Sequence, residues 1–139
     1  MFSKKNNKGF TLMEMLIVVA IIAILIAIMI PTFNAQLEKA REAADAANIR
    51  SAYAEVMVAY LDPDSTLPTG VTKDKTTSAL SKEVDLQQAQ DDWQTTTLED
   101  NIGKLGTVTE NEKPSKGGTC TVTVATTGAV TISYAGADN

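Results

Sequence analysis

The stretch Gly9-Phe10-Thr11-Leu12-Met13-Glu14 opens an uncharged run that extends from Met15 to Ile30. It places one carboxylate, that of Glu14, at the edge of a segment apolar enough to enter a bilayer. An ionised side chain at the bilayer centre costs about 3 kcal/mol, and it costs less only where it reaches the interface or finds a partner. The position of Glu14 therefore calls for a functional explanation.

The apolar run is long enough to cross a membrane as one helix. Residues 10–30 would span about 32 Å, close to the roughly 30 Å thickness of the hydrocarbon core. Lys4, Lys5 and Lys8 precede the run without any acid, so the positive-inside rule places residue 1 in the cytoplasm and the C-terminus outside. A cleaved secretory signal peptide is the alternative, but the run is too long for one and no small-residue cleavage site follows closely.

Residues 32–61 predict an amphipathic continuation of the same helix, in which apolar or small residues recur largely at three- and four-residue steps. The predicted inward face consists of Phe33, Leu37, Ala40, Ala44, Ala47, Tyr53, Val56 and Tyr60. The predicted solvent face consists of Glu38, Lys39, Arg41, Glu42, Asp45, Arg50 and Glu55. Asp62-Pro63 ends the helix, because the residue before a proline is disfavoured in the α region. Pro31 predicts a kink, because it removes the amide that would bond to the Ala27 carbonyl.

The composition restricts the chemistry that the chain can perform. The 139 residues include no histidine and one cysteine, Cys120, so the commonest general base is absent and no intramolecular disulfide can form. Without the first nine residues, nine basic residues oppose seventeen acidic ones, and this net charge of −8 disfavours direct nucleic-acid binding. No nucleophile-base pair, phosphate loop or pair of catalytic acids stands out, and residues 62–66 begin like a calcium loop but have Leu67 where the loop requires glycine. We expect neither an enzyme nor a protein that binds a metal or cofactor.

The basic leader, the Gly9-to-Glu14 motif, the apolar run and Pro31 together resemble the class III signal of type IV pilins and related pseudopilins. The resemblance covers about the first sixty residues. It implies that a prepilin peptidase cuts between Gly9 and Phe10 and methylates the new amine of Phe10. It also implies that Glu14 pairs with the Phe10 amine of a neighbouring subunit, where an unpaired buried charge would penalise wrong registers by about 3 to 5 kcal/mol. Glu14 and Phe10 are thus the predicted assembly residues.

The same resemblance implies an architecture and a set of partners. The expected parts are a removed leader (residues 1–9), a transmembrane and filament-core helix (10–31), an amphipathic helix (32–61) and a globular headpiece (62–139). The expected fold is α+β, a pilin-like ladle in which a long helix over about residues 10–61 carries a small C-terminal antiparallel sheet on its second half. Expected partners are further copies of the chain, the prepilin peptidase, the assembly platform and its ATPase, minor pilins and, before assembly, the cytoplasmic membrane.

Local patterns predict the elements of the headpiece. Residues 62–76 are typical of a loop, residues 78–89 of a short helix, and the apolar spacing over 98–105 of one or two helical turns. Alternating apolar residues predict a hairpin of strands 119–126 and 129–135 around Gly128, with a third strand at 107–109. Cys120 is expected to be a buried strand residue. Because many Gram-negative pilins have two cysteines near the C-terminus, a single one is compatible with a monoderm source.

Three functions are compatible with these features. The first is the major subunit of a type IV pilus, which resides in the cytoplasmic membrane before assembly and on the cell surface afterwards, and supports adhesion, motility or related functions. The second is the major pseudopilin of a type II secretion system or of a competence pilus. The third is a signal-anchored surface protein that does not polymerise, and the Gly9-Phe10 site argues against it.

Overall fold

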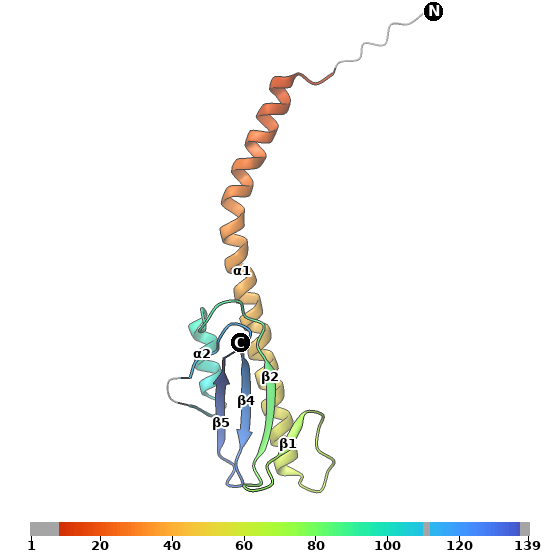
Figure 1. The fold of residues 1–139 in the computed structure, drawn as a ribbon, viewed down its shortest axis with the longest axis vertical. Helices are drawn as coiled ribbons and strands as arrows, with labels where there is room; N and C mark the ends of the chain where they lie inside the picture. Colours follow the sequence, from red (N-terminus) through yellow and green to blue (C-terminus); the bar gives the residue numbers. More distant parts are fainter. Residues whose placement is uncertain (1–8, 110–111, 137–139) are drawn as a thin grey trace, which may run out of the picture. The chain divides into compact units, whose positions relative to one another are not determined.

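The computed structural model describes residues 9–109 and 112–136, so the predictions made for residues 1–8 lie outside the described range. The chain divides into two compact units, one ending at Gln36 and the other beginning at Leu37. Helix α1, Leu12–Leu61, contributes its first part to one unit and its second part to the other (Figure 1). All later helices and strands belong to the second unit.

Helix α1 begins two residues later than predicted and ends at the predicted residue. At its end the amide of Asp62 still donates to the carbonyl of Val58 at 3.0 Å, and Pro63 follows, which lacks an amide hydrogen. Pro31 lies inside the helix, which continues through it. The hydroxyl of Thr32, the next residue, donates to the carbonyl of Ile28 at 3.4 Å. The kink at Pro31 stays a prediction.

A five-stranded sheet packs against the second part of α1 (Figure 1). The strands lie in the order β1-β2-β4-β5-β3. Their bounds in chain order are Val71–Lys73 for β1, Leu80–Asp85 for β2, Thr107–Val108 for β3, Thr119–Val124 for β4 and Val130–Ala135 for β5. Neighbouring strands are antiparallel except β3 and β5, which are parallel. The α+β fold is thus confirmed, with a sheet that is mixed and not purely antiparallel.

The C-terminal elements agree with the sequence-based prediction. Strands β4 and β5 form the predicted hairpin, and Gly128 in its turn has a φ of +84°, which favours glycine. Helix α2, Thr96–Gly103, occupies the predicted helical turns, and β3 is the predicted third strand. Cys120 is buried on β4, as expected.

The prediction for residues 62–89 was wrong in two places. Residues 71–73 form strand β1 within the expected loop, and residues 80–85 form strand β2 where a helix was expected. Leu80 is buried and Val84 half-buried, whereas Glu83 and Asp85 between and after them are exposed, which is a period of two. All six residues of β2 pair with β4. Pairing with a strand that lies far along the chain therefore overrides the weak local preference for a helix.

The core lies between the sheet and one face of α1, and it forms two clusters. The larger cluster joins α1 to β4, β5 and α2 and contains Ala46, Ile49, Ala52, Leu86, Trp93, Ile102, Cys120, Val122, Ile132 and Tyr134. The smaller one joins the end of α1 to β1, β2 and β4 and contains Val56, Ala59, Val71, Leu80 and Val124. The sheet therefore covers α1 from about its middle to its C-terminal end.

The buried face of α1 differs from the predicted inward face. Of the predicted set, Val56 is buried and Tyr53 and Tyr60 are half-buried, whereas Phe33, Leu37, Ala40, Ala44 and Ala47 are exposed. Alanines lie on both sides of the helix and do not distinguish them. Ile49, which was not in the predicted set, is fully buried. The larger side chain determines which side packs, because it removes more apolar surface from water than an alanine does.

Candidate assembly surface

The predicted cleavage site lies before the first turn of α1. Gly9 and Phe10 precede the helix and are both exposed, and Phe10 exposes 80% of its surface. Phe10 and Glu14 line one shallow depression of about 310 Å³ together with Met15, Ile17 and Val18. The structure thus brings the two predicted assembly residues to the same place on one chain.

Glu14 also caps the helix on which it lies. The amide of Thr11 donates to Oε2 of Glu14 at 2.7 Å, and the amide of Glu14 donates to Oγ1 of Thr11 at 3.2 Å. Such reciprocal bonds form a capping box, which satisfies two amides that the first turn of a helix leaves without partners. The pattern Thr-x-x-Glu at positions 11–14 is its sequence signature, so Thr11 could have been identified from the sequence and was missed.

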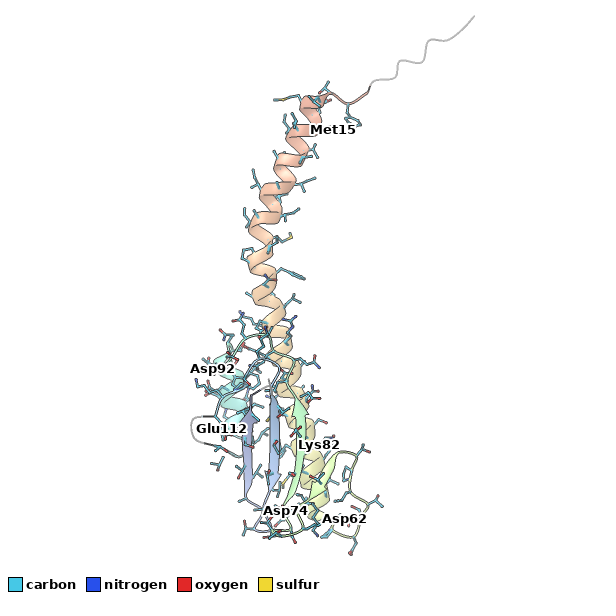
Figure 2. All side chains as sticks on the ribbon, in the orientation of Figure 1. Met15, Asp62, Asp74, Lys82, Asp92 and Glu112 are labelled. Atoms are coloured by element: carbon cyan, nitrogen blue, oxygen red, sulfur yellow. The ribbon has the colours of Figure 1, made fainter. Side chains whose placement is uncertain are left out.

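The first part of α1 exposes every one of its side chains. Residues 12–36 are all exposed, and the apolar ones include Leu12 at 80% and Ile28 at 66%. Figure 2 shows these side chains projecting from the helix on all sides, from the labelled Met15 onward. A continuous apolar surface of this extent is typical of a membrane-embedded or partner-covered segment and not of one exposed to water.

The second part of α1 carries an outward stripe on the side that the core leaves free. The stripe follows alternating steps of three and four residues, and its members are Leu37, Ala40, Ala44, Ala47, Ser51, Ala54, Val58 and Leu61, all exposed. Residues at such steps share one helix face. Alanine and serine side chains allow a second helix to approach closely, as small residues do at helix contacts in membranes.

Three acids were predicted on the solvent face of α1, and the structure shows that this was wrong. Glu38, Glu42 and Asp45 are exposed by only 3%, 0% and 0%. They follow one another at steps of four and three residues and so lie on one side of the helix, toward the segment of residues 86–94 that follows β2. We call these three carboxylates the acid clasp.

The acid clasp binds backbone amides of the 86–94 segment and, within residues 9–109 and 112–136, no lysine. Asp45 accepts the amides of Gln87 and Gln88 at 2.9 Å. Glu38 accepts those of Ala89 and Gln90 at 2.8 Å, and Glu42 accepts that of Gln94 at 2.6 Å. Buried amides need acceptors, and this segment has no strand partner to provide them. Acids at these spacings usually indicate a solvated helix face, so no signal in the sequence identified the clasp.

The 86–94 segment is held on its other side by residues 112–118. The amides of Leu86 and Asp92 donate to the carbonyls of Gly118 and Pro114 at 2.8 and 2.7 Å. Asp92 has a φ of +67°, which aspartate tolerates better than most residues, and its Oδ1 accepts the amide of Trp93 at 2.8 Å. This bend directs Trp93 into the core, where it is a core residue and not an exposed contact.

Burial of the clasp affects the ionisation of Asp45. Removal from water raises the pKa of Asp45, and the nearby charges of Glu38 and Glu42 raise it further, against the lowering effect of the amides of Gln87 and Gln88. Arg41, which is partly exposed, contacts Oε2 of Glu38 at 3.4 Å. Oε2 of Glu42 is buried without a hydrogen bond in the described part of the chain. The clasp is therefore a buried acidic cluster that is held mainly by hydrogen bonds from backbone amides.

Two further groups join α1 to the sheet. Lys82 of β2 forms an ion pair with Glu55 of α1 and also donates to the carbonyl of Thr69 at 3.2 Å. The hydrogen bond with Lys82 lowers the pKa of Glu55. Burial raises the pKa of the Cys120 thiol to about 12, so this cysteine is protonated at neutral pH and unreactive.

Comparison with known proteins gives one match. Residues 4–30 match the model of the prokaryotic N-terminal methylation motif. The match confirms the predicted type IV pilin-like prepilin signal, which implies processing by a prepilin peptidase and assembly into a pilus-type structure. Together with the apolar helix it supports membrane anchoring before assembly. Searches of curated proteins and of solved structures found no match.

Proposed function

We propose that this chain is the major structural subunit of a type IV pilus. The observation that carries the proposal is the methylation motif at residues 4–30, together with the first part of α1, residues 12–36, in which every apolar side chain is exposed. Outside a bilayer these side chains must be covered, and further copies of the same helix cover them most simply. Stacking of identical subunits through different surfaces is an open arrangement, and it produces fibres instead of closed rings.

In this proposal Glu14 guides each subunit to its place. The peptidase cuts between Gly9 and Phe10, and the Phe10 amine of a neighbouring subunit pairs with the Glu14 carboxylate. The capping box supports this role, because it holds one oxygen of Glu14 on the amide of Thr11 and so restricts the direction of the carboxylate. A restricted carboxylate loses less side-chain entropy when the partner amine arrives.

In the proposed filament, the outward stripe on the second part of α1 contacts a neighbouring subunit. It is exposed, apolar and lined with small residues, so it can receive the apolar helix of another copy. The acid clasp makes this possible by turning Glu38, Glu42 and Asp45 inward. The charged residues that stay exposed between positions 37 and 54 are then Lys39, Arg41 and Arg50, at the sides of the stripe.

Mass spectrometry of filaments sheared from the cell surface tests the proposal. We expect a chain that begins at Phe10 and carries one methyl group on its amine, as the dominant component of long filaments. A chain that begins at Met1 in those filaments would refute the prepilin assignment. A correctly processed chain that stays in the membrane fraction, with another protein as the bulk of the filament, would refute the role of major subunit.

A further inference from the structure

The second unit contains a cavity of about 450 Å³ that the assembly surface does not use. The aromatic residues Trp93 and Tyr134 line it together with Val108 and Pro114. Both aromatic residues are more than nine-tenths buried, at 7% and 8% exposure, so the cavity reaches into the core. Its volume lies at the small end of the range of ligand pockets, about 300 to 1,000 Å³.

Acids and a helix end also line this cavity. Glu99 and Asp100 come from α2 and Glu112 from the segment after β3. Gly103 and Lys104, at the C-terminal end of α2, line the cavity as well, and the carbonyl groups at a helix C-terminus attract positive charge. In Figure 2 the labelled Glu112 and Asp92 lie on the side of the second unit that carries α2.

The bases near the opening balance this negative charge only in part. Lys113 forms an ion pair with Asp92, and the hydrogen bond between them raises the pKa of Lys113 and lowers that of Asp92. Lys113 is therefore paired mainly with Asp92, which lies outside the trio of Glu99, Asp100 and Glu112, and it is attracted more weakly to Glu99. Lys104 is exposed and, among the residues that the structure describes, is the other base that lines the cavity.

We propose that this cavity binds a small organic cation, an ammonium or guanidinium group. Its aromatic lining and its surplus of carboxylates are the two features that recognise such groups, because a ring face and a carboxylate both attract positive charge. The site is separate from the proposed filament contacts and does not depend on them. An anionic ligand would be repelled by the carboxylates of Glu99 and Asp100, and by that of Glu112, whose Oε2 accepts the amide of Tyr134 at 2.9 Å.

The chain provides its own probe, because Trp93 is its one tryptophan. Full-length protein in a non-ionic detergent would be titrated with choline and with 3,3-dimethylbutan-1-ol, which has the same shape without the charge. Methylguanidinium and methylurea form a second pair of the same kind. We expect a saturable change in Trp93 fluorescence with at least one cation and a much weaker one with its neutral counterpart. The pair that responds identifies the preferred cationic group.

Three variants test the roles of the surrounding charges. Glu99→Gln with Asp100→Asn should weaken cation binding about tenfold, since two carboxylates are lost. Glu83→Gln with Asp85→Asn, which removes two exposed acids from β2, is the matched control and should leave binding unchanged. Lys104→Gln should tighten binding, because it removes a competing positive charge. Equal responses to a cation and its neutral counterpart, or equal affinities in the two acid-removing variants, would overturn the proposal.

Discussion

The two parts of helix α1 have the same backbone geometry but differ in which side chains they expose and which they bury. From residue 12 to residue 36 every side chain is exposed and nearly all are apolar. From residue 37 to residue 61 one side is buried under the sheet and the 86–94 segment, and this buried side includes three carboxylates. Exposure of apolar groups and burial of charged ones both cost free energy. The exposed apolar side chains of residues 12–36 therefore imply a partner outside the chain. The cost of burying the three carboxylates is offset within the chain, by the amides of the 86–94 segment.

The largest expected effect separates the two roles of Glu14, docking and capping. Glu14→Ala should leave membrane insertion and headpiece stability intact and reduce sheared filaments at least about a hundredfold, because an unpaired amine in the filament costs about 3 kcal/mol or more. Thr11→Ala removes a capping bond worth about 1 kcal/mol and keeps the carboxylate, so filaments should persist. Glu83→Ala, an exposed acid on β2, is the control. Equal losses in Glu14→Ala and Thr11→Ala would mean that capping, and not docking, is what matters.

The second prediction concerns the acid clasp. Asp45→Ala should lower the free energy of unfolding of the second unit by about 3 kcal/mol, because the buried amide of Gln88 and the partly buried amide of Gln87 lose their acceptor. Urea denaturation of the full chain in detergent, followed by Trp93 fluorescence, measures this. Arg50→Ala, an exposed residue of the same helix, should change the value by less than about 0.5 kcal/mol. If both variants unfold at the same urea concentration, the clasp adds no stability.

A neighbouring pair of alanines tests which side of α1 is buried. Ala46 is 1% exposed and Ala47 is exposed. Ala46→Leu should destabilise the second unit by about 1 to 3 kcal/mol through overpacking of the core. Ala47→Leu should leave the free energy of unfolding within about 0.5 kcal/mol of the unmodified value and reduce the yield of filaments, because it enlarges the outward stripe. The reverse order of stabilities would show that the helix packs on the originally predicted face.

The smallest effect is the pH dependence that Asp45 contributes. A carboxyl whose pKa is raised on folding binds its proton more tightly in the folded state, so its contribution to stability is complete below its unfolded pKa of about 3.9 and is lost as the pH rises through the folded pKa. The unmodified chain should therefore lose stability relative to Asp45→Asn over this window, by at most about 1.4 kcal/mol per pH unit. Parallel curves for the two proteins would contradict the raised pKa.

Some features follow from the sequence because they depend on residues close together in the chain. The membrane-length helix, its end at Asp62-Pro63, the β4-β5 hairpin and the prepilin signal each arise from a continuous pattern. Strand β2 and the buried side of α1 could not be obtained in this way. Strand β2 exists because β4 pairs with it, and Glu38 is buried because it accepts amides from residues more than fifty positions away.

The sequence by itself determined about the first thirty residues of this protein: where the signal lies, which bond is the predicted cleavage site and where Glu14 stands in the apolar run. These properties are local, since a peptidase or a bilayer acts on the chain as an extended or single-helix segment. The tertiary structure alone decided which side of residues 37–61 stays free for a partner and how Trp93 and Tyr134 come to line one cavity. A carboxylate can be buried only where other groups donate hydrogen bonds to it. For the acid clasp these donors are amides that are distant in the sequence, and only the folded chain brings them close.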